Sequence, residues 1–206
     1  MRNSLAALVV VGSLVGAGAG VHAQIIDRIL AVVNGAIILQ SDVAVAIRLG
    51  LVPSAGAPDP AAAALDNLIE RQLMLSEVDR YAPPDPAEAD VDRHVADIRA
   101  RANAQFDAIL LQGGITVDQL RREVRDSLRI EAYLQQRFGG TQPTEEEILQ
   151  YYRDHPAAFS QNGTVRTFDD VHDVARAALI EERRGATIRD WIAGLRRRAN
   201  VSVPPR

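Results

Sequence analysis

The stretch from Arg28 to Asp42, RILAVVNGAIILQSD, constrains the fold more than any other part of this chain. Two apolar runs flank Asn34-Gly35, and both central residues of a type I′ turn need positive φ, which Asn and Gly tolerate best. The pattern therefore predicts a β-hairpin with a two-residue turn. In the expected register, four pairs face each other: Val33–Ala36, Val32–Ile37, Ala31–Ile38 and Leu30–Leu39.

Both faces of this hairpin are apolar, because successive side chains point to opposite sides of a strand. One face carries Ile29, Ala31, Val33, Ala36 and Ile38. The other carries Leu30, Val32, Ile37 and Leu39. A sheet with one face in water would alternate apolar with polar residues, so we expect neither face to meet water. A lone hairpin is marginally stable, and the rest of the chain must then cover both faces.

Most of the remaining chain shows helical periodicity, with start and stop signals at the expected places. Ser41 is the expected N-cap of a short helix over 42–49. Asp59-Pro60 and Asp85-Pro86 are typical helix starts, and they predict helices over 60–81 and from 86 to Leu111. Capping boxes and apolar stripes predict three more helices, over 117–138 after Thr116, over Glu145–Asp154 after Thr144, and from Thr167 to about Ala199.

The last apolar residues, Val201 to Val203, predict a short strand, which we place on an edge of the hairpin. This placement would bring the two ends of the mature chain together. The sequence therefore predicts a mainly α fold, with a small antiparallel β-hairpin at the N-terminus that is joined by a C-terminal strand. Pro156 to Arg166 is expected to be a polar connector.

Composition restricts the function. Hydrophobic residues make up 47% of the 206 residues and aromatic residues only 4%, so aliphatic side chains must form the core. The chain has no cysteine, which excludes disulfides and a cysteine-ligated metal. The net charge of −4 offers no basic surface for phosphates, so we expect no nucleic-acid partner.

Residues 1–23 have the features of a secretory signal peptide. Arg2 is a positive start, the apolar run from Leu5 to Val15 is short for a bilayer crossing, and Val21-His22-Ala23 fits the small-x-small cleavage pattern. An uncleaved N-terminal anchor is the alternative. We expect an exported, periplasmic protein whose mature domain covers residues 24–206.

Two groups of polar residues are candidate sites of chemistry. Asp169, His172 and Asp173 share a helix face and could hold a divalent metal, but acids are also favoured in a first helical turn. The second group is a basic stripe of four arginines, Arg121, Arg122, Arg125 and Arg129. Acidic residues lie between them, so a solvated helix face of mixed charge is the alternative. With no catalytic or nucleotide-binding motif in the sequence, we expect no catalytic residue, no metal and no cofactor.

Apolar surface is the remaining candidate for function, because amphipathic helices can hold extended apolar peptides. The candidate client-binding residues lie in the loop after the first helix and near the Gly113-Gly114 turn. They are Leu49, Leu51, Val52, Phe106, Leu110 and Leu111. Core packing is the alternative for each of them.

Several segments together resemble the SurA-like periplasmic chaperones, which are related to parvulin-type peptidyl-prolyl isomerases. The resemblance is carried by DRILAVVNGAIILQSDV from Asp27, by LIERQLMLSEVDRY from Leu68, by FDAILLQGGITVDQLRREVRDSLRIEAYL from Phe106, by PTEEEILQYYRDHPAAF from Pro143 and by the tail from Thr167 to Val203. No single motif is diagnostic, but the ordered set is specific and covers most of residues 25–203.

The resemblance implies a helical chaperone domain whose closing helix and strand, 167–203, pack back on 25–159. In that family, parvulin domains usually lie between the segment that ends near Phe159 and the closing helix. Only Ser160 to Arg166 lies there in this chain, and seven residues cannot form a catalytic domain. The isomerase activity is therefore not implied.

The resemblance thus predicts an ATP-independent chaperone that binds unfolded outer-membrane or secreted proteins. Two alternatives stay open: a residual enzyme of the isomerase family, and a non-catalytic accessory protein of an envelope complex. Dimerisation through the helices is also left open.

Overall fold

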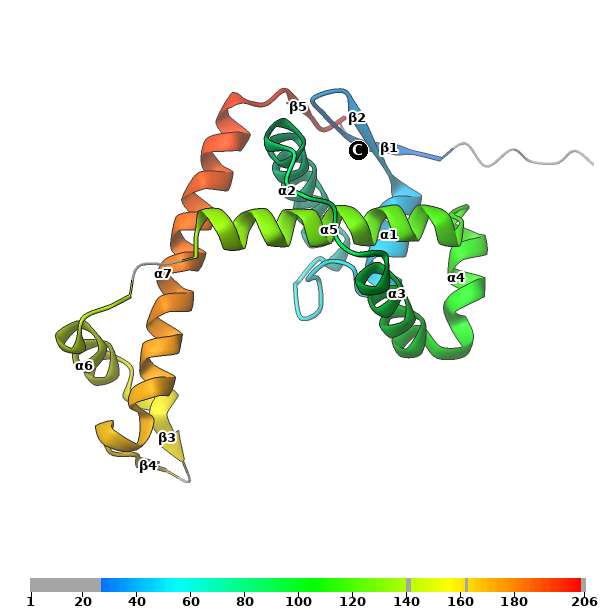
Figure 1. Cartoon of the computed structure of the whole chain (residues 1–206). Helices are drawn as coiled ribbons and strands as arrows, with labels where there is room; N and C mark the ends of the chain where they lie inside the picture. The colour runs from blue at the N-terminus through cyan, green and yellow to red at the C-terminus, as the bar shows by residue number, and fades with distance from the viewer. Residues whose placement is uncertain (1–26, 140–141, 162, 205–206) are drawn as a thin grey trace, which may run out of the picture.

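The computed structural model describes residues 27–139, 142–161 and 163–204. The predicted signal peptide, 1–23, lies outside the described residues. The chain is mainly helical, with a small three-stranded antiparallel sheet at one end of the body (Figure 1). This is the fold class that the sequence predicts.

The N-terminal hairpin consists of β1 (Ile29–Val33) and β2 (Ala36–Leu39). Asn34 and Gly35 have φ of 50° and 92°, as the predicted turn requires. Three of the expected pairs form, but Leu30 does not face Leu39. A bulge between Ile29 and Ala31 shifts the ladder, so that Leu39 pairs with Ile29.

The predicted C-terminal strand is also confirmed. β5 (Val201–Ser202) pairs antiparallel with β1, and the strand order is β2-β1-β5. Val32 faces Ser202 in this ladder. Both ends of the described chain therefore meet in one sheet, and β2 forms one of its edges.

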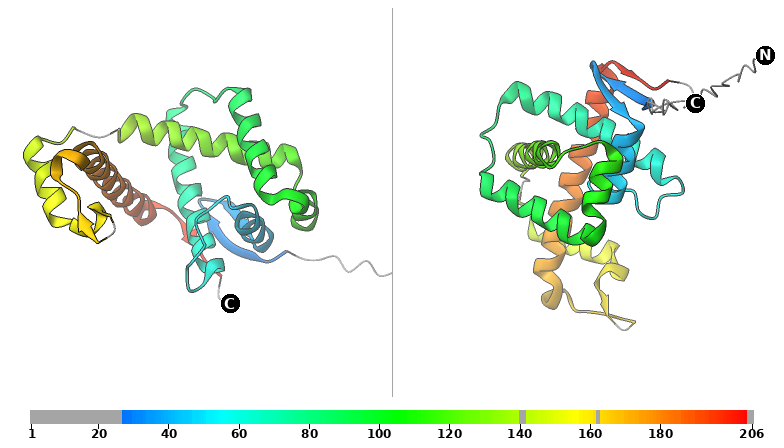
Figure 2. Two further views of the ribbon diagram at one scale, coloured as in Figure 1. Left: turned by 90° about the horizontal axis from the view of Figure 1, so that it is seen from below. Right: turned by 90° about the vertical axis from the view of Figure 1, so that its right-hand side faces the viewer.

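The expectation that both faces of the sheet avoid water is wrong. Ala31, Val33 and Ile38 are buried on one face, whereas Ile37, on the other face, is 55% exposed. The helices in contact with the hairpin, α1 (Gln40–Leu49) and α2 (Pro60–Tyr81), gather on one side of the sheet (Figure 2). An apolar pattern on both faces of a sheet favours burial of both faces. The pattern does not ensure that the chain has helices placed to cover the second face.

The helix starts are confirmed at three of the five positions where we expected side-chain caps. Asp59 accepts hydrogen bonds from two backbone N–H groups of α2. Thr116 and Thr144 form the predicted capping boxes of α5 (Val117–Arg137) and α6 (Glu145–Asp154). The Ser41 prediction is wrong, because Ser41 lies inside α1 and its hydroxyl donates to Asp27.

The helix predicted to start at Asp85-Pro86 begins later and is broken. It forms α3 (Glu88–Ala102), a 3-10 turn (Asn103–Gln105) and α4 (Phe106–Gly113). Asn103 has a φ of 50°, a conformation that asparagine tolerates better than most residues. The apolar spacing stays in phase through this turn, so periodicity alone could not reveal the break.

The segment from α6 to the first half of the last helix forms an arm (Figure 1). α6 packs on the long helix α7 (Phe168–Arg198), which follows the predicted range closely. A 3-10 turn (Pro156–Phe159) lies between α6 and the short antiparallel pair β3 (Ser160–Gln161) and β4 (Thr164–Val165). The expected polar connector is thus partly a hairpin.

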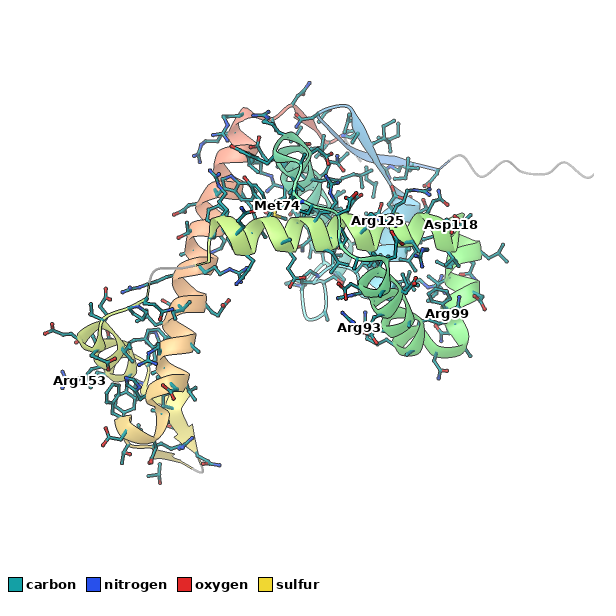
Figure 3. All side chains as sticks on the ribbon, in the orientation of Figure 1. Met74, Arg93, Arg99, Asp118, Arg125 and Arg153 are labelled. Atoms are coloured by element: carbon teal, nitrogen blue, oxygen red, sulfur yellow. The ribbon has the colours of Figure 1, made fainter. Side chains whose placement is uncertain are left out.

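Helix α7 connects the arm to the body. Leu195, near its C-terminal end, packs in the core beneath the sheet, and Leu179 packs in a separate core with Ile148 of α6. Arg153 on α6 and Asp118 at the start of α5 consequently lie at opposite ends of the molecule (Figure 3). None of the helices in residues 27–139, 142–161 and 163–204 combines the length and apolar character that a bilayer crossing needs.

Candidate functional site

Three of the six predicted client-binding residues are core residues. Leu49 is 3% exposed, Phe106 1% and Leu110 5%. They lie in one apolar cluster that joins α1, α3, α4 and α5. In this structure they form the packing that holds these helices together, which is the alternative that the sequence left open.

The other three predicted residues are accessible, but they do not lie together. Leu51 and Val52 follow α1 and are half-buried; Leu51 lines both of the hollows described next, and Val52 lines the second. Leu111 on α4 is 82% exposed and lines neither hollow. Of these three accessible residues, the structure brings together only Leu51 and Val52.

The first hollow has a volume of about 340 Å³ and lies between β2, α1, α2 and the N-terminal half of α5. Aliphatic side chains and polar or charged side chains both line it. The apolar residues that matter below are Ile37, Ile38, Val45, Leu51, Leu68 and Leu120.

The second hollow has a volume of about 220 Å³ and lies between the loop after α1 and helices α2, α3 and α5. Leu51 and Leu68 line it as well as the first hollow. Val52, Ile98 and Leu128 add to its apolar lining. The two hollows are thus neighbours with a shared wall.

An ion pair belongs to that shared wall. Arg71 of α2 and Glu123 of α5 line both hollows, with Arg71 Nη1 3.0 Å from Glu123 Oε2. The other terminal nitrogen of Arg71 donates to the Glu123 backbone carbonyl at 2.8 Å. Arg71 is 16% exposed, so this contact fixes α2 against α5 between the two hollows.

Polar groups lie around the hollows. Asp42 and Arg122 line the first, and Asp97, Arg101 and Glu131 line the second. Burial raises the pKa of Asp42, against the opposing effect of the hydrogen bond that its carboxylate accepts from the Leu39 N–H at 2.8 Å. The charges are thus mixed in sign at both hollows.

Leu68, Arg71 and Glu123 were missed as site residues. Leu68 does fall on the apolar stripe that predicts α2, but a stripe cannot show which part of it stays uncovered. Arg71 and Glu123 look like ordinary surface charges in the sequence, because their pairing joins two helices that are distant along the chain.

The Asp169–Asp173 group forms ion pairs with α6. His172 Nε2 lies 2.6 Å from Glu145 Oε2, and Arg176 contacts both Glu145 and Asp173, at 3.3 and 3.2 Å. The hydrogen bond to Glu145 raises the pKa of His172. Among the described residues, no group of three or more His, Cys, Asp or Glu side chains is placed to hold a metal ion.

The basic stripe of α5 also forms ion pairs with neighbouring helices. Arg121 and Arg125 both pair with Glu88 of α3, at 2.8 and 2.6 Å, and Arg129 pairs with Asp79 of α2 at 2.9 Å. Figure 3 shows Arg125 on the middle of α5, next to α3. These arginines fix the helices of the body to one another.

Comparison with known proteins adds no further support. No protein-family model matches the chain, and a search of curated proteins finds no match either.

Proposed function

We propose that this chain is an ATP-independent holding chaperone of the periplasm, and that it binds unfolded outer-membrane or secreted proteins through the two hollows. Two lines of reasoning support the proposal. The first is the resemblance of the ordered segments to the SurA-like chaperones. The second is the pair of adjoining hollows that share Leu51, Leu68 and the Arg71–Glu123 pair.

The groups that the two hollows share suit an apolar chain segment better than a small polar ligand. A small-molecule site usually presents a few polar groups that converge on the ligand. Here Arg71 and Glu123 are bound to each other, and the Asp42 carboxylate accepts the Leu39 N–H. Burial of apolar side chains against Leu51 and Leu68 would supply the binding energy, at about 25 cal/mol per Å² buried.

A holding chaperone must also release its client. Two small hollows bury little surface, so each apolar segment should bind weakly, with a dissociation constant on the order of micromolar or weaker. Several weak segments on one client raise the overall affinity through effective concentration. Release then follows when the client folds or inserts and its apolar segments are no longer available.

The test is suppression of aggregation. The chain without residues 1–23 is purified, and an unfolded β-barrel membrane protein is diluted from urea in its presence while light scattering is recorded. We expect scattering to fall at a modest molar excess, without nucleotide. Unchanged scattering at a large molar excess would overturn the proposal.

Two further measurements on the same protein address the alternatives. A proline-peptide isomerisation assay should show no acceleration over the uncatalysed rate, whereas acceleration would favour the residual enzyme. N-terminal sequencing of the protein from a periplasmic extract should begin at Gln24. A chain that begins at Met1 and sediments with membranes would favour an uncleaved anchor.

A further inference from the structure

The position of the first hollow relative to β2 is informative. Ile37 and Ile38 are consecutive residues of β2, so their side chains point to opposite faces of the sheet. Both residues nevertheless line the first hollow. A space that meets two consecutive residues of a strand lies along the edge of that strand. The inner edge of β2 is paired with β1, so the first hollow borders the free edge.

The hydrogen-bond pattern identifies the free backbone groups on that edge. In a two-residue hairpin the pair Val33–Ala36 closes the turn, and the next pair, Val32–Ile37, is not hydrogen-bonded across the ladder. The Asn34 N–H donates to the Asn200 carbonyl at 2.9 Å, so the backbone groups of Asn34 point towards β5. Those of Val32, two residues earlier, point the same way, because Val32 pairs with Ser202 of β5. Val32 therefore does not bond to Ile37. The N–H and C=O of Ile37 therefore point away from β1.

Leu39, two residues after Ile37, shows how the end of this edge is closed. The Leu39 N–H also points outward, and it donates to the Asp42 carboxylate at 2.8 Å. Among the described residues, no hydrogen bond involves the outward N–H of Ile37. Within the described residues, Ile37 is thus an open donor and acceptor next to the first hollow, and it is 55% exposed.

We propose that the free edge of β2 takes up an extended segment of an unfolded client as a fourth strand, with an apolar client side chain in the first hollow. This inference rests on the proposed function and specifies its binding mode. Main-chain hydrogen bonds to Ile37 would make the site tolerant of client sequence, and the hollow would select apolar side chains at alternate positions.

Two features favour a client segment over a second copy of this chain. β2 has only four residues, which span about 13 Å, and pairing two such edges buries far less than the roughly 1,200 Å² of a stable interface. The charges that line the hollow also balance, with Asp42 and Glu123 against Arg71 and Arg122. That balance suits an uncharged segment and disfavours one of high charge.

The test uses a fluorescein-labelled octapeptide of alternating threonine and valine, and two forms of it that carry backbone N-methyl groups. One form is methylated at the odd positions and the other at the even positions. In an added strand only alternate N–H groups face β2. We expect one form to bind the mature chain at least about tenfold more weakly in fluorescence anisotropy, as one or two lost hydrogen bonds and a steric clash predict, and the other to bind like the parent peptide.

Equal loss in both forms, or no loss in either, would overturn the edge-strand proposal. If the chain suppresses client aggregation but does not bind the parent peptide, the edge-strand proposal is overturned, while the proposed chaperone function still holds. A concentration-dependent dimer that the peptide dissociates would assign the edge to a second copy and contradict our choice of occupant.

Two variants test the same edge from the protein side. Ile37→Pro removes the outward N–H, and proline is tolerated on an edge strand where the N–H faces away from the ladder. Ile37→Val keeps the N–H, the preference for a strand and an apolar side chain at the hollow, and is the matched control. We expect peptide binding to be lost in Ile37→Pro and largely kept in Ile37→Val. If Ile37→Pro fails to fold by circular dichroism, the N-methyl comparison decides alone.

Discussion

Asn34 and Asn200, which are 166 residues apart, exchange two hydrogen bonds. The Asn34 N–H donates to the Asn200 carbonyl at 2.9 Å, and the Asn200 N–H donates to Asn34 Oδ1 at 3.0 Å. The residue that supplies positive φ for the hairpin turn thus also fixes the chain just before β5. One side chain therefore links the start of the described chain to its end.

Substitutions of Asn34 should separate these two roles. Asn34→Gly keeps access to positive φ but loses the Oδ1 acceptor, and we expect it to lower the free energy of unfolding by about 1 kcal/mol. Asn34→Ala loses the acceptor and also strains the turn, so we expect about 1–3 kcal/mol more. Urea unfolding monitored by circular dichroism measures both. Equal stability of Asn34→Gly and the parent chain would mean that the bond to Asn200 contributes nothing.

Two glycine-to-alanine substitutions should change stability in opposite directions. A Cβ on Gly113 would lie 2.2 Å from Cγ2 of Val45, a stiff β-branched side chain in the core, so Gly113→Ala should cost about 1–3 kcal/mol. A Cβ on Gly194, inside α7, would meet nothing nearer than 3.7 Å, so Gly194→Ala should add about 0.4–1 kcal/mol. Thermal unfolding distinguishes the two. A stabilised Gly113→Ala would show that α4 does not pack closely on α1.

The contact of α6 with α7 should depend on pH through His172. Because the bond to Glu145 raises the pKa of His172 above 6.5, protonated His172 favours the folded arm. This contribution is complete below pH 6.5 and is lost as the pH rises through the raised pKa of the folded state. NMR titration of the imidazole should give a pKa above 6.5. In Glu145→Gln the value should fall back, and a value that does not change would exclude this ion pair in solution.

Glu147, in the first turn of α6, should titrate at unusually low pH. The Arg183 guanidinium and the Thr144 N–H lower the pKa of Glu147 to about 2. The stabilisation from this carboxylate is therefore complete above its ordinary value of 4.5 and is lost as the pH falls towards about 2. Carboxyl NMR should report the low pKa, and Arg183→Gln should raise it, whereas Arg176→Gln should leave it nearly unchanged.

Local signals in the sequence predicted much of the fold. Asn34-Gly35 predicted the hairpin turn, Thr116 and Thr144 predicted helix starts, and Val201 predicted the third strand. Each of these features depends on neighbouring residues or on a strong apolar pattern. The break at Asn103 and the bulge after Ile29 were missed. The apolar periodicity continues through Asn103, and no turn residue in the sequence marks the bulge.

The candidate site could be predicted only in part. Leu51 and Val52 line the hollows, but Leu49, Phe106 and Leu110 are equally apolar in the sequence and are buried. The difference between a buried and an accessible leucine is set by helices from elsewhere in the chain. The role of Arg71 and Glu123 depends on how α2 meets α5, which no pattern within either helix specifies.

Site-specific photo-crosslinking tests the central claim, that the two hollows hold unfolded clients. A benzophenone amino acid replaces Leu51, which lines both hollows, or Leu111, which is exposed on α4 and lines neither. Each protein is irradiated with an unfolded β-barrel membrane protein, and adducts are detected by mass. We predict strong adducts from position 51 and background levels from position 111. Equal adducts from both positions, or adducts from position 111 alone, would contradict the proposed site.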